Sequence, residues 1–290
     1  MPEIAQIELK AASEVVRSVP TRQAANGIRY GTYGNIQLPT AELERMLEAV
    51  PSAIAAALHR RQYYFVALTL GESPSTDWTD ETFRQVDARK LMIAADSSSE
   101  LSDTAVCHRN VTVDGAECVF ISTRLMQDRF ALSFEFYINA GHHFVDAVGV
   151  PQSFMHLVWS QAEANVRGET SQDAWEQRNK ALGVDGIETA APVTKRRRPK
   201  FWAGKLTQEP AIPNRVLDEK ARTEYLEAAF SDAVAIYLLS LTVDFDYSEL
   251  REREYPLLPA PALAERLRHV AQLFPPPHGY EFSIHYRRNR

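Results

Sequence analysis

The segment AVCHRNVTVDGAECVFIST, residues 105–123, constrains the fold more than any other part of the chain. Two runs rich in β-branched and aromatic residues flank the dipeptide Asp114-Gly115, which is a strong signal for a two-residue hairpin turn. Such a turn fixes the pairing of the two strands, because a slip of one residue would move every side chain to the other face. The predicted pairs are Val113 with Ala116, Thr112 with Glu117, and His108 with Ile121.

The side chains of this hairpin divide between a polar and an apolar face, since successive residues of a strand point to opposite sides. The apolar face is typical of a core, apart from Arg109, and carries Cys107, Val111, Val113, Cys118 and Phe120. The polar face carries His108, Asn110, Thr112 and Glu117, followed by Val119, Ile121 and Thr123.

The next segment, RFALSFEFYIN, also alternates apolar with polar residues, which predicts a third antiparallel strand. In that strand Ser133, Glu135, Tyr137 and Asn139 share one side. If this side continues the polar face of the hairpin, the face is either a solvated sheet surface or the floor of a pocket. The presence of Tyr, Asn and Thr instead of long charged side chains favours the pocket. There, Glu117 or Glu135 supplies a general base, and His108 a proton donor or an anion-binding group.

The remainder of the chain predicts an α+β fold, a mostly antiparallel sheet with helices packed on one face. We expect a single domain over residues 1–290, with a long irregular connection at about 183–213, which is rich in Pro, Gly and charge. Hydrophobic periodicity and turn signals place the other elements. Predicted helices cover 40–50, 52–60, 151–167, 171–182, 214–241 and 261–273, and predicted strands cover 62–70, 91–95 and 280–286.

Composition narrows the classes of partner. The formal net charge is -6, which argues against general nucleic-acid binding, because that needs a broad basic surface. The apolar run at 233–243 is too short to cross a bilayer, and two cysteines in 290 residues suit a reducing cytosol. Since no nucleotide-binding or metal-binding motif is present, we expect a cytoplasmic protein with a small-molecule substrate, no cofactor and no metal.

The segment HHFVDAVG offers one hypothesis about chemistry. Its His142-x-x-x-Asp146 spacing resembles the motif of CoA-dependent acyltransferases, in which a histidine between a strand and a helix deprotonates an attacking hydroxyl or amine. This chain departs from the family, because only two residues separate His143 from the aspartate and no Asp-Phe-Gly-Trp-Gly motif follows. The alternatives are a metal site and a structural pair in a loop, with one ring packed and the other hydrogen-bonded.

A second resemblance is one of layout. An arginine, then a histidine, then a glutamate about ten residues later is similar to the bacterial Pictet–Spengler enzymes that form β-carbolines without a cofactor. Arg89, His108 and Glu117 match those positions, although the spacing differs and Arg109 competes with Arg89. The resemblance implies that the arginine and the histidine hold the carboxylate of tryptophan, that the glutamate is the base, and that an aldehyde is the second substrate.

Two catalytic residues and eight binding residues therefore form the expected site. The catalytic pair is Glu117 and His108, and the binding residues are Arg89, Asn110, Thr112, Glu135, Tyr137, Asn139, His142 and His143. A third hypothesis is a non-catalytic small-molecule-binding or dimeric scaffold protein. It draws on the helical stripe of Leu226, Phe230, Ala233 and Tyr237, which suits either a core or a homodimer interface.

Overall fold

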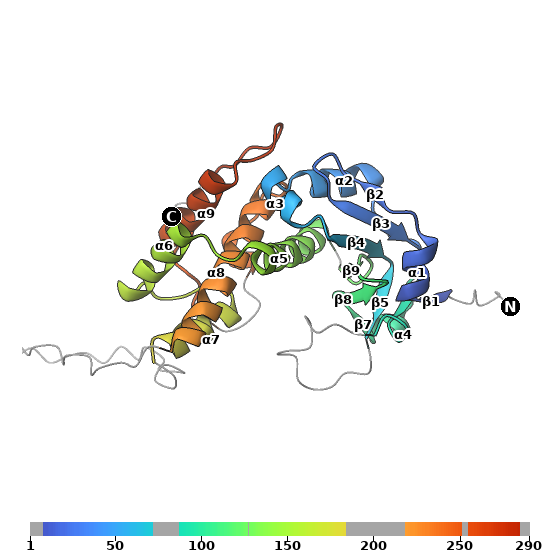
Figure 1. Cartoon of the computed structure of the whole chain (residues 1–290), viewed down its shortest axis with the longest axis horizontal. Coiled ribbons are helices and arrows are strands. Elements are labelled where there is room, and N and C mark those ends of the chain that lie inside the picture. Colours follow the sequence, from blue (N-terminus) through green and yellow to red (C-terminus); the bar gives the residue numbers. More distant parts are fainter. Residues whose placement is uncertain (1–7, 72–86, 127, 184–217, 251–254, 285–290) are drawn as a thin grey trace, which may run out of the picture.

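The computed structural model describes residues 8–71, 87–126, 128–183, 218–250 and 255–284 (Figure 1). Its strands are β1 (Leu9–Ala11), β2 (Arg22–Gln23), β3 (Arg29–Tyr33), β4 (Arg61–Val66), β5 (Leu68–Leu70), β6 (Met92–Ala94), β7 (Ala105–Val106), β8 (His108–Val113) and β9 (Ala116–Ser122). Its helices are α1 (Ala12–Ser18), α2 (Thr40–Glu48), α3 (Ser52–Ala57), α4 (Ser99–Ser102), α5 (Arg129–Val148), α6 (Gln152–Glu163), α7 (Gln172–Ala181), α8 (Glu219–Ser240) and α9 (Ala260–Leu273), with a 3₁₀ turn at Tyr247–Leu250.

The strands form two sheets, and the chain is an α+β protein as predicted. The smaller sheet has the order β1-β6-β5-β7 and is antiparallel throughout. The larger has the order β2-β3-β4-β9-β8, in which β4 pairs in parallel with both of its neighbours. A strand with sheet partners on both sides and helices or a second sheet on its faces needs apolar residues on both faces. The sequence YYFV at 63–66 meets that need and is fully buried.

The predicted hairpin is confirmed residue by residue. Val113 pairs with Ala116, Thr112 with Glu117, and His108 with Ile121 across β8 and β9. Asp114 and Gly115 both have positive φ, at 50° and 81°, which is the backbone that a tight hairpin turn requires. The apolar face is confirmed at Val111, Val113, Cys118 and Phe120, which join one buried cluster with Ala12 and Val15 of α1. The prediction is wrong for Cys107, which is exposed because it lies between β7 and β8, outside the paired hairpin.

The predicted third strand is wrong, because residues 129–148 form the helix α5. The Asp128 side chain caps this helix by accepting a hydrogen bond from the backbone N–H of Ala131. The helix α5 is covered on two sides, by the large sheet and by α8 (Figure 1). Apolar residues therefore occur around most of its circumference, and their alternation with polar residues in the sequence resembles that of a strand. Gly141 marks the crossing with α8, where a Cβ would lie 2.6 Å from the carbonyl oxygen of Ser231.

The helices α2, α3, α6, α7, α8 and α9 follow the predictions, with ends shifted by a few residues, whereas the short helices α1 and α4 were not predicted. The stripe on α8 is core, since Leu226, Phe230, Ala233 and Tyr237 are all buried. The strand predicted at 280–286 is wrong over the described residues 280–284, which pair with no strand. Most of the predicted connection at 183–213 lies outside the described residues. Cys107 and Cys118 form no disulfide with each other, as expected from their offset positions on the hairpin.

One apolar cluster extends from the large sheet through α5 to the C-terminal helices, and it includes Val119 and Ile121 from the predicted polar face. In Figure 1, α5 lies between the strands and the group formed by α6, α7, α8 and α9. The polar part of the hairpin therefore faces this helix. None of the described helices is both long enough and apolar enough to cross a membrane.

Candidate functional site

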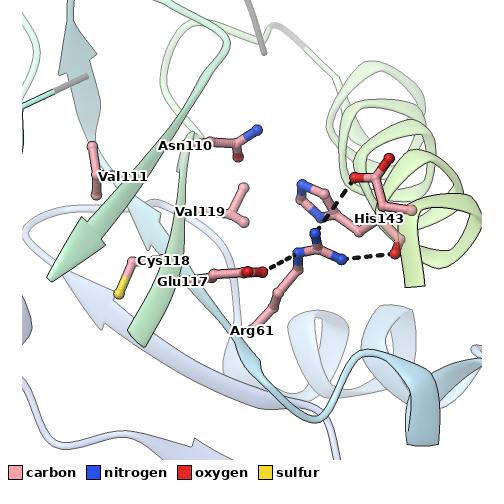
Figure 2. Close-up of a pocket in the computed structure, with 8 residues that line it drawn as sticks. Arg61, Asn110, Val111, Glu117, Cys118, Val119 and His143 are labelled. Carbon is pink, nitrogen blue, oxygen red and sulfur yellow. Dashed lines mark hydrogen bonds and ion pairs between the residues drawn. The ribbon is translucent and has the colours of Figure 1, made fainter. Parts of the chain in front are cut away.

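A small cavity opens where the large sheet meets α5, and it contains three of the predicted site residues (Figure 2). Its volume is about 140 Å³. The lining residues come from β4, β8, β9 and α5, and they are Arg61, Asn110, Val111, Glu117, Cys118, Val119, His143 and Asp146. The polar face is thus a cavity wall over part of its length, since Asn110 and Glu117 stand on it.

Arg61 holds the cavity together from the first position of β4. Its Nε is 2.8 Å from Glu117 Oε2 of β9, its paired residue across the parallel strands. Its Nη1 donates to the backbone oxygen of His143 at 2.7 Å, and its Nη2 lies 3.4 Å from Asp146 Oδ2 (Figure 2). A cation near the last turn of a helix is also favoured by the helix dipole. The guanidinium therefore joins the sheet to the end of α5.

The two carboxylates of the cavity remain accessible to solvent. The side chain of Glu117 is 45% exposed and that of Asp146 63% exposed, whereas Arg61 is only 15% exposed. The pKa of Asp146 is raised, first by partial burial and then by the nearby charge of Glu117, while Arg61 opposes the shift. The carboxylates thus face the opening of the cavity, with the arginine behind them.

His143 is the buried imidazole of the cavity. Its Nδ1 lies 3.2 Å from the hydroxyl of Tyr63, a residue of β4 that is fully buried. Burial lowers the pKa of His143 well below its usual value, and the positive charge of Arg61 adds to the effect. The ring is therefore neutral at pH 7 and acts as a hydrogen-bonding group in that range.

A second polar group lies beside the cavity, between β8 and α5. His108 donates from Nδ1 to Glu135 Oε1, and Asn139 donates to the same carboxylate oxygen at 3.3 Å. His142 is close enough for His108 to contribute to its lowered pKa, which burial sets at about 4. Glu135 and Asn139 do meet the hairpin as predicted, but from successive turns of a helix instead of a neighbouring strand.

Three predicted residues lie elsewhere. Thr112 is exposed near the tip of the hairpin and does not line the cavity. The Tyr137 hydroxyl points away from the sheet and donates to the backbone oxygen of Met46 at 2.9 Å, because α5 turns this residue toward α2. Arg89 is exposed and does not line the cavity, and its neighbours Ala88 and Leu91 pack in the buried cluster that includes α1. The predicted grouping of Arg89 with His108 and Glu117 is therefore wrong.

Sequence reasoning missed Arg61 and Tyr63, and assigned Asp146 only to the acyltransferase motif. The pairing of Arg61 with Glu117 depends on β4 lying parallel to β9, and nothing in the local pattern of either strand indicates that partner. The context expected for the His142-x-x-x-Asp146 motif, a strand before and a helix after, is absent because both residues lie within α5. In the described part of the chain, no group of three or more metal-ligating side chains occurs.

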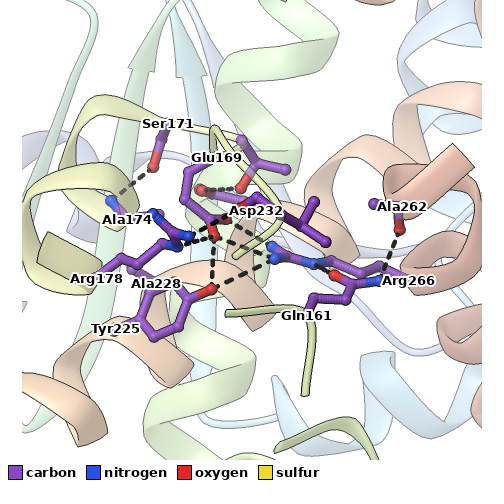
Figure 3. A network of polar contacts seen from close by, with 12 residues as sticks. Gln161, Glu169, Ser171, Ala174, Arg178, Tyr225, Ala228, Asp232, Ala262 and Arg266 are labelled. Atoms are coloured by element: carbon purple, nitrogen blue, oxygen red, sulfur yellow. Dashed lines mark hydrogen bonds and ion pairs between the residues drawn. The ribbon is translucent and has the colours of Figure 1, made fainter. Parts of the chain in front are cut away.

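A second cluster of charges lies among the C-terminal helices (Figure 3). Glu169, in the connection between α6 and α7, is 1% exposed and forms a two-pronged ion pair with Arg266 of α9, at 2.7 and 3.2 Å. Arg178 of α7 lies 3.8 Å from the same carboxylate, Tyr225 of α8 donates to it, and Gln161 of α6 accepts from Arg266 Nε at 2.8 Å. The network joins four helices.

Asp232 extends this network within α8. It accepts a hydrogen bond from Thr170 Oγ1 at 2.8 Å, and it is 5% exposed. Burial raises the pKa of Asp232 to about 6, and the negative charge of Glu169 acts in the same direction. These groups are buried and hydrogen-bonded to one another across the helices, so we assign the network to the packing of the helices.

Comparison with known proteins adds no relative. No family model matches the chain, and no curated protein or solved structure matches it at a significant level. The functional argument therefore depends on the geometry of the cavity.

Proposed function

We propose that the cavity at the end of α5 is the active site of a cofactor-independent enzyme that performs acid–base chemistry on a small molecule. One observation carries the proposal: a solvent-accessible carboxylate, Glu117, and a neutral imidazole, His143, share a cavity with the Asn110 amide. Cavities with an apolar wall and a few converging polar groups are typical of small-molecule sites.

Glu117 is the proton acceptor in this proposal. The contact with Arg61 holds one carboxylate oxygen in place, and the exposed fraction of the side chain lets a substrate reach the group. His143 stays neutral and offers a hydrogen bond to substrate. The pair formed by His108 and Glu135 is a positioning element, because it fixes β8 against α5 and so fixes the wall that carries Asn110.

The finer proposal is a condensation of the Pictet–Spengler type. An amine and an aldehyde lose water to form an iminium ion, an aromatic carbon attacks it to make the new C–C bond, and Glu117 accepts the proton that the ring carbon releases. The residues needed are a base and a shaped cavity. Arg89 has no part in this version, since it does not line the cavity.

Incubation with tryptamine or tryptophan and acetaldehyde tests the finer proposal. We expect a fluorescent product with the summed mass of the two substrates less one water. In the Glu117→Gln variant kcat should fall by about 10²-fold or more, as for the loss of a general base. Glu100→Gln, at an exposed position of α4, is the matched control and should retain full activity.

Two results would contradict the proposal. Wild-type activity in Glu117→Gln would remove Glu117 from the chemistry. Ligand binding without turnover of any amine and aldehyde pair would instead favour the third hypothesis, a non-catalytic small-molecule-binding protein.

A further inference from the structure

We propose that the ligand of this cavity is a compact cation, a primary ammonium group on a skeleton about the size of one ring. This inference rests on the proposed function only in taking the cavity to be a ligand site. It differs from the expectation drawn from the sequence, in which the site holds the carboxylate of tryptophan, and it implies that part of a two-ring indole substrate would lie outside the cavity.

The charges around the cavity favour a cation. Arg61 supplies one positive charge, whereas Glu117 and Asp146 supply two negative charges and His143 is neutral. A further carboxylate belongs to Glu227 of α8. Its pKa is raised first by burial and then by the negative charge of Asp146. Glu117 contributes to the raised pKa of Asp146, and a cation that arrives beside Asp146 would stabilise its charged form.

The hydrogen-bonding groups lead to the same conclusion. All three guanidinium nitrogens of Arg61 already have acceptors, in Glu117, in the backbone of His143 and in Asp146. Asn110 Oδ1, in contrast, is buried without a donor in the described part of the chain. The wall thus offers acceptors in excess, and an ammonium group, which has three donors and no acceptor, is complementary to it.

The size of the cavity limits the rest of the ligand. A volume of about 140 Å³ is close to that of an engineered cavity, about 150 Å³, that accommodates benzene. Val119 contributes an apolar surface to the wall, and the carboxylates stand toward the opening. A single ring therefore fits inside, with its amine directed at Glu117 and Asp146.

Titration calorimetry with three probes of equal size tests this inference: benzylamine, benzyl alcohol and benzoate. They differ mainly in charge, being cationic, neutral and anionic at pH 7. We expect benzylamine to bind at least tenfold more tightly than benzyl alcohol and benzoate to show no binding. Equal affinities, tighter binding of benzoate or no binding of benzylamine would each overturn the inference.

Two variants locate the site. Glu117→Gln and Asp146→Asn each remove one carboxylate charge without changing the shape of the side chain. Each should raise the Kd of benzylamine at least fivefold. Benzyl alcohol serves as the internal control, because its affinity should change little. Unchanged benzylamine affinity in both variants would place the cation elsewhere and overturn the inference.

The outcome is separable from that of the proposed enzyme activity. Benzylamine binding that depends on Glu117, with no turnover of amine and aldehyde pairs, supports the ligand class and contradicts the enzyme. Turnover together with preferred benzoate binding supports the enzyme and contradicts the ligand class.

Discussion

Two arginines of this protein, Arg61 and Arg266, each join separate elements through carboxylates, but they do so in opposite environments. Arg266 and Glu169 are 0% and 1% exposed, and the neighbouring helices supply hydrogen bonds to both (Figure 3). Arg61 lines a cavity (Figure 2) and is 15% exposed, whereas the carboxylates of Glu117 and Asp146 that it contacts are 45% and 63% exposed.

The difference separates a structural from a functional use of the same chemistry. A buried charge must be paired and hydrogen-bonded, because an unpaired one costs several kcal/mol. The network at Glu169 meets that requirement, since Arg266, Tyr225 and Gln161 pair the buried groups with one another. Accessible carboxylates, by contrast, remain hydrated and contribute about 0–1 kcal/mol through an ion pair. Their presence at a cavity is therefore better explained by binding than by folding.

The largest effect should follow from breaking the buried network. Arg266→Met leaves the carboxylate of Glu169 buried beside only the more distant Arg178, and we expect a loss of about 3–5 kcal/mol in the free energy of unfolding, measured in urea. Arg268→Met is the control on the exposed side of the same helix and should cost less than about 0.5 kcal/mol. If the two variants unfold at a similar urea concentration, the network does not stabilise the fold.

A smaller, pH-dependent effect is expected at Asp232. Because its folded pKa is raised from 3.8 to about 6, the folded state binds an extra proton between those values, and this contribution to stability falls as pH rises through that window. The stability of the wild type relative to Asp232→Asn should therefore decrease by on the order of 2–3 kcal/mol between pH 4 and pH 7. The free energy of unfolding of both proteins is measured at each pH. A difference between them that does not change with pH would contradict the raised pKa of Asp232.

The sequence predicted the regions whose partners are local. The register of the hairpin follows from Asp114-Gly115 alone, and Asn110 and Glu117 reach the cavity because that register is right. The helix α5 was mistaken for a strand, since burial against both the sheet and α8 hides its period. That error placed Glu135 and Asn139 near His108 for a wrong reason, and it moved Tyr137 to the wrong side.

Contacts between distant parts of the chain could not be predicted. Arg61 meets Glu117 only because β4 and β9 are parallel neighbours, and Glu169 meets Arg266 across 97 residues of sequence. No local pattern records such a partner, so both arginines look like ordinary surface charges in the sequence.

The most direct test of the central claim is the free energy of unfolding of Glu117→Gln, measured in urea beside its affinity for benzylamine. If Glu117 serves binding and not folding, stability should stay within about 0.5 kcal/mol of the wild type while the affinity falls at least fivefold. A variant that unfolds as readily as Arg266→Met, or that binds benzylamine as tightly as the wild type, would contradict the account.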